Sequence, residues 1–138
     1  MALMPSRVKY RKLQKINLRG VATRGASLAF GEYGLKSLNN GWIKNTQIEA
    51  VRVVLARQLH KGGKLWIRVF PDISVTKKPA EVRMGKGMGD LDHWGCAVKR
   101  GKIMFELGGV PEEYARLCFR MVAYKLPFKT KFVTRGHK

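Results

Sequence analysis

No acidic residue precedes Glu32, so every charged side chain in the first 31 residues is basic, and this limits what the N-terminal segment can fold into. Residues 1–25 contain seven Lys or Arg side chains, and their apolar residues follow no steady period. Such a segment has neither a helical nor a strand face to bury, and its like charges repel one another. We therefore predict a basic arm over residues 1–25 and a single folded domain over residues 26–138.

The charge balance predicts the partner. The 138 residues include 28 Lys or Arg and 9 Asp or Glu, a net charge of +19, and 45% of them are hydrophobic, enough for one core. A balance this basic favours a polyanion, with nucleic acid first and an anionic membrane surface as the alternative. Every apolar run is shorter than the about 20 residues of a spanning helix. Residues 1–6 are too short for a signal peptide, so secretion is not expected.

The arm is predicted to become ordered where phosphates neutralise it, and Tyr10 is suited to stacking on a base or a sugar. A frayed, solvated terminus is the alternative. The candidate RNA-binding residues of the arm are Arg7, Lys9, Tyr10, Arg11, Lys12, Lys15, Arg19 and Arg24.

Hydrophobic periodicity predicts an α+β sandwich, with two helices packed on a mostly antiparallel sheet. A capping box of Thr46 and Glu49 is expected to start the first helix, and Pro111 lies in the first turn of the second. The second helix has the stronger apolar pattern, with Ala115, Cys118, Phe119, Val122 and Leu126 on one face. The expected strands are 27–30, 33–38, 64–70 as a central strand, 73–82, a hairpin of 93–98 with 103–107, and 128–133.

Cys96 and Cys118 fall on apolar faces and are expected in the core. They have no CxxC partner, and the three histidines lack ligand spacing, so we expect neither a metal nor a cofactor.

A glycine-rich loop, Arg83-Met84-Gly85-Lys86-Gly87-Met88-Gly89, combines cations with backbone that can approach a partner closely. No Ser or Thr follows Gly85-Lys86, as a Walker-type loop requires, and the spacing is not that of a Rossmann fingerprint. A hairpin tip in which glycine only turns the chain is the alternative. The long cations favour contact with RNA.

Asp90, Asp92 and His93 lie together after this loop and could be imagined as an acid and a base. No nucleophile accompanies them, so catalysis is not expected. The two aspartates are better suited to orienting the end of the loop.

Several long motifs resemble the bacterial-type large-subunit ribosomal protein sixteen family, and the resemblance covers nearly the whole chain in order. They are Pro5-Ser6-Arg7-Val8-Lys9-Tyr10-Arg11-Lys12, Phe30-Gly31-Glu32-Tyr33-Gly34-Leu35-Lys36, Gln47-Ile48-Glu49-Ala50, Trp66-Ile67-Arg68-Val69-Phe70-Pro71-Asp72, Lys77-Lys78-Pro79-Ala80-Glu81-Val82-Arg83-Met84-Gly85-Lys86-Gly87, Gly109-Val110-Pro111-Glu112-Glu113 and Lys125-Leu126-Pro127-Phe128-Lys129-Thr130.

The resemblance implies a non-enzymatic α+β constituent of the large ribosomal subunit. Its partners would be large-subunit ribosomal RNA, transfer RNA in the A site, with the P site as the alternative, and neighbouring ribosomal proteins, with no membrane and no small-molecule substrate. By position, the arm would enter ribosomal RNA and the loop from Arg83 to Gly89 would approach transfer RNA near the peptidyl transferase region. Lys129 and Lys131 on the last strand, and Arg52 and Arg57 on the first helix, are further ribosomal RNA candidates. For the helix, a solvated face is an equally good interpretation.

The sequence departs from the family at three places. Met88 replaces a usual lysine, Asn17 and Leu18 dilute the arm, and residues 44–46 replace the usual start of the first helix. These departures favour a mitochondrial copy slightly over a bacterial one. A free basic RNA-binding regulatory module is the alternative function.

Overall fold

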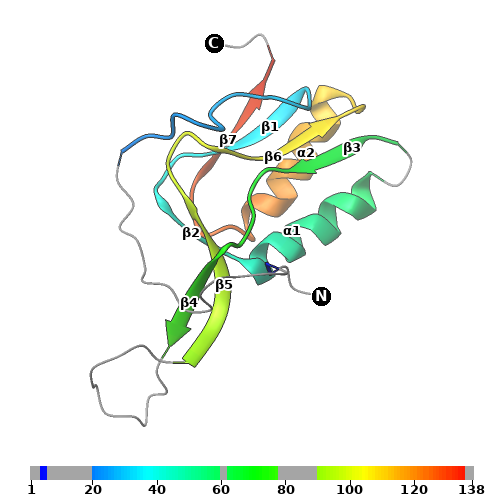
Figure 1. Ribbon diagram of the computed structural model, residues 1–138. Coiled ribbons are helices and arrows are strands. Elements are labelled where there is room, and N and C mark those ends of the chain that lie inside the picture. The colour runs from blue at the N-terminus through cyan, green and yellow to red at the C-terminus, as the bar shows by residue number, and fades with distance from the viewer. Residues whose placement is uncertain (1–3, 6–19, 60–61, 78–89, 136–138) are drawn as a thin grey trace.

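The computed structural model describes residues 4–5, 20–59, 62–77 and 90–135. Two helices cover one side of a four-stranded sheet, and a smaller three-stranded sheet extends away from them (Figure 1). The elements are β1 (Tyr33–Ser37), β2 (Gly41–Lys44), α1 (Asn45–Gln58), β3 (Lys64–Ile67), β4 (Ile73–Lys77), β5 (Asp90–Val98), β6 (Ile103–Gly108), α2 (Glu112–Ala123) and β7 (Thr130–Thr134). The predicted α+β class is confirmed.

All strand pairs within the two sheets are antiparallel. The larger sheet has the order β3-β6-β1-β7, and the smaller one has the order β2-β5-β4. The described residues therefore form two sheets where the sequence predicted one. No helix in the described ranges is both long and apolar enough to span a membrane.

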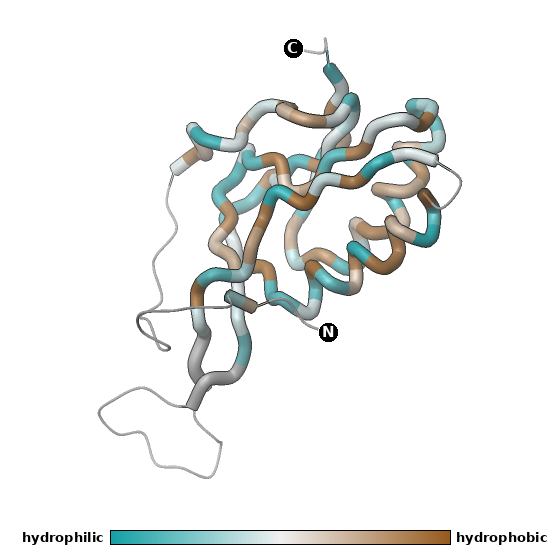
Figure 2. The backbone as a smooth tube through the Cα atoms, turned by 45° about the vertical axis from the view of Figure 1, so that its right-hand side comes forward, coloured by the Kyte–Doolittle hydropathy of each residue, from teal (hydrophilic) through white to brown (hydrophobic). Residues whose placement is uncertain are grey.

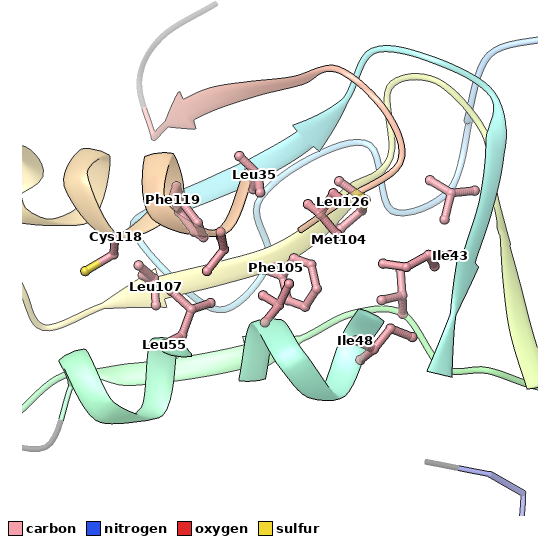
Figure 3. Close-up of a cluster of buried hydrophobic side chains, with 14 of the residues drawn as sticks. Leu35, Ile43, Ile48, Leu55, Met104, Phe105, Leu107, Cys118, Phe119 and Leu126 are labelled. Carbon is pink, nitrogen blue, oxygen red and sulfur yellow. The ribbon is translucent and has the colours of Figure 1, made fainter. Parts of the chain in front are cut away.

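The core lies between the larger sheet and the helices (Figure 3). Leu35, Phe105 and Leu107 from β1 and β6 meet the apolar faces of both helices. Hydrophobic and hydrophilic residues alternate in patches along those helices (Figure 2), as expected when one face is buried. The predicted buried face of the second helix is confirmed for Ala115, Cys118, Phe119 and Val122, whereas Leu126 is also buried but lies beyond the end of α2. Both cysteines are free and buried.

The predicted hairpin of 93–98 with 103–107 is wrong, because β5 and β6 belong to different sheets. The turn between them does close, with the Lys102 N–H donating to the Lys99 carbonyl at 3.2 Å. Beyond it the strands separate. Arg100 instead bridges Val21, and its N–H donates to Asn40 Oδ1 at 2.7 Å. The β6 strand, buried along its whole length, pairs with β1 and β3.

The strand at 64–70 was predicted to be central, but β3 is shorter and lies at an edge of the larger sheet. The two faces of β3 are apolar for different reasons. Leu65 and Ile67 pack against the core, whereas Trp66 on the other face stacks with Phe30, with ring centroids 6.3 Å apart. Side chains can thus be covered on both faces of a strand that lies at the edge of its sheet.

The predicted capping box of Thr46 and Glu49 is wrong, because the N-cap is Lys44, two residues earlier, and α1 begins at Asn45. The Lys44 N–H donates to Gln47 Oε1 at 2.9 Å, and Asn45 Oδ1 accepts from the Thr46 N–H at 2.9 Å. Glu49 is bound to Arg52 on the helix surface instead of closing the cap.

Candidate nucleic-acid interface

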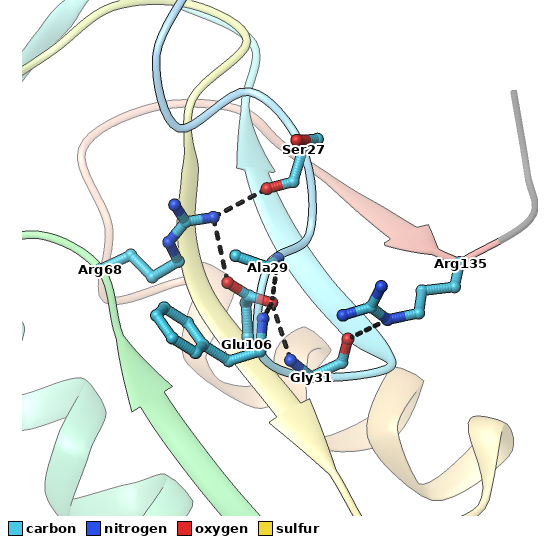
Figure 4. A network of polar contacts seen from close by, with 7 residues as sticks. Ser27, Ala29, Gly31, Arg68, Glu106 and Arg135 are labelled. Atoms are coloured by element: carbon cyan, nitrogen blue, oxygen red, sulfur yellow. Dashed lines mark hydrogen bonds and ion pairs between the residues drawn. The ribbon is translucent and has the colours of Figure 1, made fainter.

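The segment that leads out of the basic arm is fixed to the sheet by one buried carboxylate. Glu106 on β6 is 0% exposed, and its Oε1 accepts three N–H donors at 2.9–3.1 Å (Figure 4). The donors belong to Ala29, Phe30 and Gly31. A strand predicted at 27–30 is therefore wrong, because these N–H groups point at a side chain and not at a neighbouring strand.

The second oxygen of Glu106 faces the guanidinium of Arg68 at 3.1 Å. That guanidinium also donates to the Ser27 carbonyl at 2.7 Å and lies 5.7 Å from the centre of the Phe30 ring. Buried charges are tolerated when they are paired and hydrogen-bonded. In Glu106 the two roles are divided, since Oε1 accepts the hydrogen bonds and Oε2 has the ion pair but no hydrogen bond among the described residues. Arg68 therefore contributes to the fold by joining Glu106 to the segment that contains Ser27.

With this anchor in place, residues 20–31 cover part of the face of the larger sheet that is turned away from the helices. The Ala22 N–H donates to the Arg100 carbonyl at 2.9 Å, and the Ile103 N–H donates to the Gly25 carbonyl at 2.7 Å. A Cβ built on Gly25 would lie 3.6 Å from Lys102 Cε. The fold thus brings the end of the arm beside the cationic turn that carries Lys99, Arg100 and Lys102.

Two lysines lie directly opposite each other on this face. Lys36 of β1 is in register with Lys131 of β7. Leu35, the neighbour of Lys36, points into the core, so the two lysines point away from the helices. Like charges opposite each other on neighbouring strands destabilise a sheet, and an anion between them would relieve this repulsion.

Two cavities adjoin this pair, and Lys36 lines both of them. The first, of about 370 Å³, lies between residues 26–28 and the end of β7 and includes Arg135. The second, of about 590 Å³, follows β7 and includes Lys131 and Arg116. Thr134 lines both, and its Oγ1 is buried without a hydrogen bond in the part of the chain that the structure describes. The described residues that line the two cavities include no carboxylate, so the electrostatics favour an anion.

Arg135 and Arg116 are partly occupied. Arg135 Nε donates to the Gly31 carbonyl at 2.8 Å. Arg116 pairs with Glu112 at 3.3 Å and lies 4.4 Å from the centre of the Phe132 ring. A guanidinium has five N–H donors, so each of them keeps donors for a phosphate.

Four cationic side chains lie on or beside β7, and we call them the β7 surface. Lys131 and Lys129 were predicted from the sequence and are exposed, as is Arg24 at the end of the arm. Lys36 was missed because only strand register brings it to β7. Arg135, which directly follows β7, was missed because the predicted strand ended at residue 133. The β7 surface consists of Lys36, Lys129, Lys131 and Arg135.

The structure separates the α1 candidates from this surface. Arg52 Nε donates to Glu49 Oε2 at 3.0 Å, and a second contact makes the pair bidentate. Arg57 is exposed on the same helix, which lies on the opposite side of the larger sheet from the β7 surface. Contact of these two arginines with ribosomal RNA stays a prediction.

The glycine-rich loop and most of the arm lie outside the described residues. The candidates affected are Arg7, Lys9, Tyr10, Arg11, Lys12, Lys15 and Arg19, together with Arg83, Met84, Gly85, Lys86, Gly87, Met88 and Gly89. The described chain stops at Lys77 and resumes at Asp90. Lys77 of β4 pairs with Asp90 of β5, and these two strands extend away from the body of the domain (Figure 1).

Among the described residues, no group of three or more His, Cys, Asp or Glu is placed to hold a metal. Burial raises the pKa of the Cys96 and Cys118 thiols, which lowers the thiolate fraction that a soft metal requires.

These features define a small α+β protein whose described residues form a hydrophobic core and a cationic sheet surface. A family model described as ribosomal protein L16p/L10e matches residues 5–133, which is nearly the whole chain. The chain belongs to this family, and its role is that of a structural protein of the large ribosomal subunit. The resemblance inferred from the sequence motifs is thereby confirmed.

Proposed function

We propose that this protein binds large-subunit ribosomal RNA through its β7 surface and its basic arm, and that the loop from Arg83 to Gly89 contacts A-site transfer RNA near the peptidyl transferase centre. The opposed lysines Lys36 and Lys131 carry the first part of the proposal. They adjoin two cavities whose described linings hold no carboxylate, so a phosphate group placed between them would offset their repulsion.

The β4–β5 hairpin supports the second part. Its two strands diverge from the body of the domain, and the loop connects their paired ends at Lys77 and Asp90. A cationic, glycine-rich loop at the end of such a hairpin is suited to reach RNA at a distance from the RNA that the β7 surface contacts. In this arrangement the β7 surface positions the protein and the loop acts on transfer RNA.

The salt dependence of binding tests the β7 surface. Each phosphate contact contributes about 0.7–0.9 to the slope of log K against log salt concentration. We expect Lys36→Ala and Lys131→Ala each to reduce this slope for purified large-subunit ribosomal RNA by about that amount. Lys64→Ala is the matched control, because Lys64 is exposed on β3 at the far edge of the same sheet. Slopes unchanged in both variants would exclude this surface.

Crosslinking from the loop tests the transfer RNA contact. A photoreactive residue in place of Met84 in translating ribosomes should crosslink to transfer RNA and to the peptidyl transferase region. Crosslinks confined to RNA outside the functional core would contradict this part of the proposal and leave the β7 surface unaffected.

A mitochondrial source likewise stays a prediction, which recovery of the protein in purified mitochondrial ribosomes would test.

A further inference from the structure

Helix α2 carries a second line of apolar side chains besides the one in the core. Leu117, Met121 and Tyr124 are spaced by four and then three residues, so they align along one side of the helix. They are 48%, 40% and 89% exposed. The core side chains of α2 point to the opposite side and are almost completely buried. We call the three exposed residues the α2 stripe.

Single exposed apolar residues are common on proteins, but several large ones in a line indicate an interaction surface. Spacings of four and three residues are those by which a helix binds an apolar groove of another protein. Met and Tyr are also enriched in protein–protein interfaces. Interfaces with nucleic acid are more polar and strongly cationic, which Leu117 and Met121 do not match.

Charged side chains of opposite sign lie toward the two ends of α2. Glu112 and Glu113 lie in the first turn of the helix, whereas Arg120 and Lys125 are exposed toward its end. Arg116 is exposed too and is already paired with Glu112, so the cations toward the end of the helix are the stronger signal. A complementary partner would therefore place carboxylates beside Tyr124. The α2 stripe lies on the side of the helix turned away from the core, and its residues do not line the two cavities beside the β7 surface, although Arg116 of the same helix lines one of them. Both surfaces can therefore be occupied at the same time.

We propose that the α2 stripe docks a neighbouring protein of the large ribosomal subunit, which presents an apolar groove with carboxylates at the end that receives Arg120 and Lys125. The inference uses the place of the family in the large subunit. It does not depend on the contacts of the β7 surface with RNA. Its experiments therefore fail or succeed separately from those of the proposed function.

The first experiment is photocrosslinking with p-benzoylphenylalanine in place of Tyr124 in assembled large subunits. The expected product joins this chain to one ribosomal protein, and the crosslinked peptide should contain apolar residues flanked by Asp or Glu. Crosslinks to ribosomal RNA alone, to another part of this chain or to a second copy of it, or no crosslink at all, would overturn the proposal.

The second experiment measures incorporation into large subunits in competition with the wild-type chain. Because interface anchors lose about tenfold or more in affinity on truncation, we expect the triple variant Leu117→Ser, Met121→Ser and Tyr124→Ser to be incorporated about tenfold less. Phe70→Ser is the control, because Phe70 is also 48% exposed but lies far from α2 in the chain. Incorporation of the triple variant at the level of this control would overturn the proposal.

The third experiment covers the case in which the triple variant does not fold. Arg120→Glu changes one exposed residue and leaves the core intact. It should reduce the yield of the Tyr124 crosslink, whereas the salt dependence of RNA binding should change no more than for Lys64→Glu. An unchanged crosslink yield would refute the proposed charge complementarity.

Discussion

Replacing Glu106 with glutamine should destabilise the domain far more than any exposed charge change. Glutamine has the same shape, so its Oε1 can still accept from the N–H groups of Ala29, Phe30 and Gly31. Those bonds lose the strength that a carboxylate gives them, about a factor of two for each. In addition, Arg68 loses its counter-ion while its side chain is only 19% exposed.

The two effects set the magnitude. Removing one partner of a fully buried ion pair costs about 3–5 kcal/mol. Arg68 is not fully buried and keeps its hydrogen bond to the Ser27 carbonyl, which lowers this figure, whereas the weakened N–H bonds raise it. We expect Glu106→Gln to lower the free energy of unfolding by about 3 kcal/mol, a large share of the about 5–15 kcal/mol of an ordinary domain.

Urea denaturation of the purified protein, followed by circular dichroism, measures this loss. The control is Glu112→Gln, which breaks an exposed ion pair with Arg116 and should cost less than about 1 kcal/mol. Hydrogen exchange gives a local readout, because the amides of residues 29–31 should exchange faster in Glu106→Gln while those of β5 keep their order of protection. A cost within about 0.5 kcal/mol of the control would refute the anchoring role.

Three further predictions concern fit, thiol reactivity and pH. Gly31→Ala should lower the unfolding free energy by about 1–3 kcal/mol in urea titrations, because the new Cβ would lie 2.6 Å from the Leu107 carbonyl oxygen; unchanged stability would contradict that packing. The thiols of Cys118 and of the cysteine in β5 should react with a thiol reagent much more slowly in native protein than in urea, because burial raises the pKa of both; equal rates would refute this. The hydrogen bond from Arg52 lowers the pKa of the Glu49 carboxyl, so the pair stabilises the fold above the ordinary glutamate pKa and this contribution disappears as the pH falls through the lowered value. Denaturation of Glu49→Gln and wild type across that range should therefore converge in acid, and a constant difference would be evidence against the pair.

Family membership and local periodicity could be read from the sequence. The buried face of α2 lies within one helix, so it could be predicted from the spacing of residues such as Cys118 and Phe119. The alternation of residues 128–133 likewise predicted a strand with Lys129 and Lys131 on its polar side. The acid-free start and the net charge predicted the basic arm and a polyanion partner, and neither depends on how the chain folds.

Pairing between distant segments was decided only by tertiary structure. Local alternation is the same for a strand at an edge and one in the centre, so 64–70 gave no sign that β3 would lie at an edge. The adjacent strands β5 and β6 also gave no sign that they would enter different sheets. The opposition of Lys36 to Lys131 and the convergence of residues 29–31 on Glu106 join positions far apart in the chain. Sequence periodicity records which side chains are buried, whereas strand register and long-range hydrogen bonds determine which of them meet.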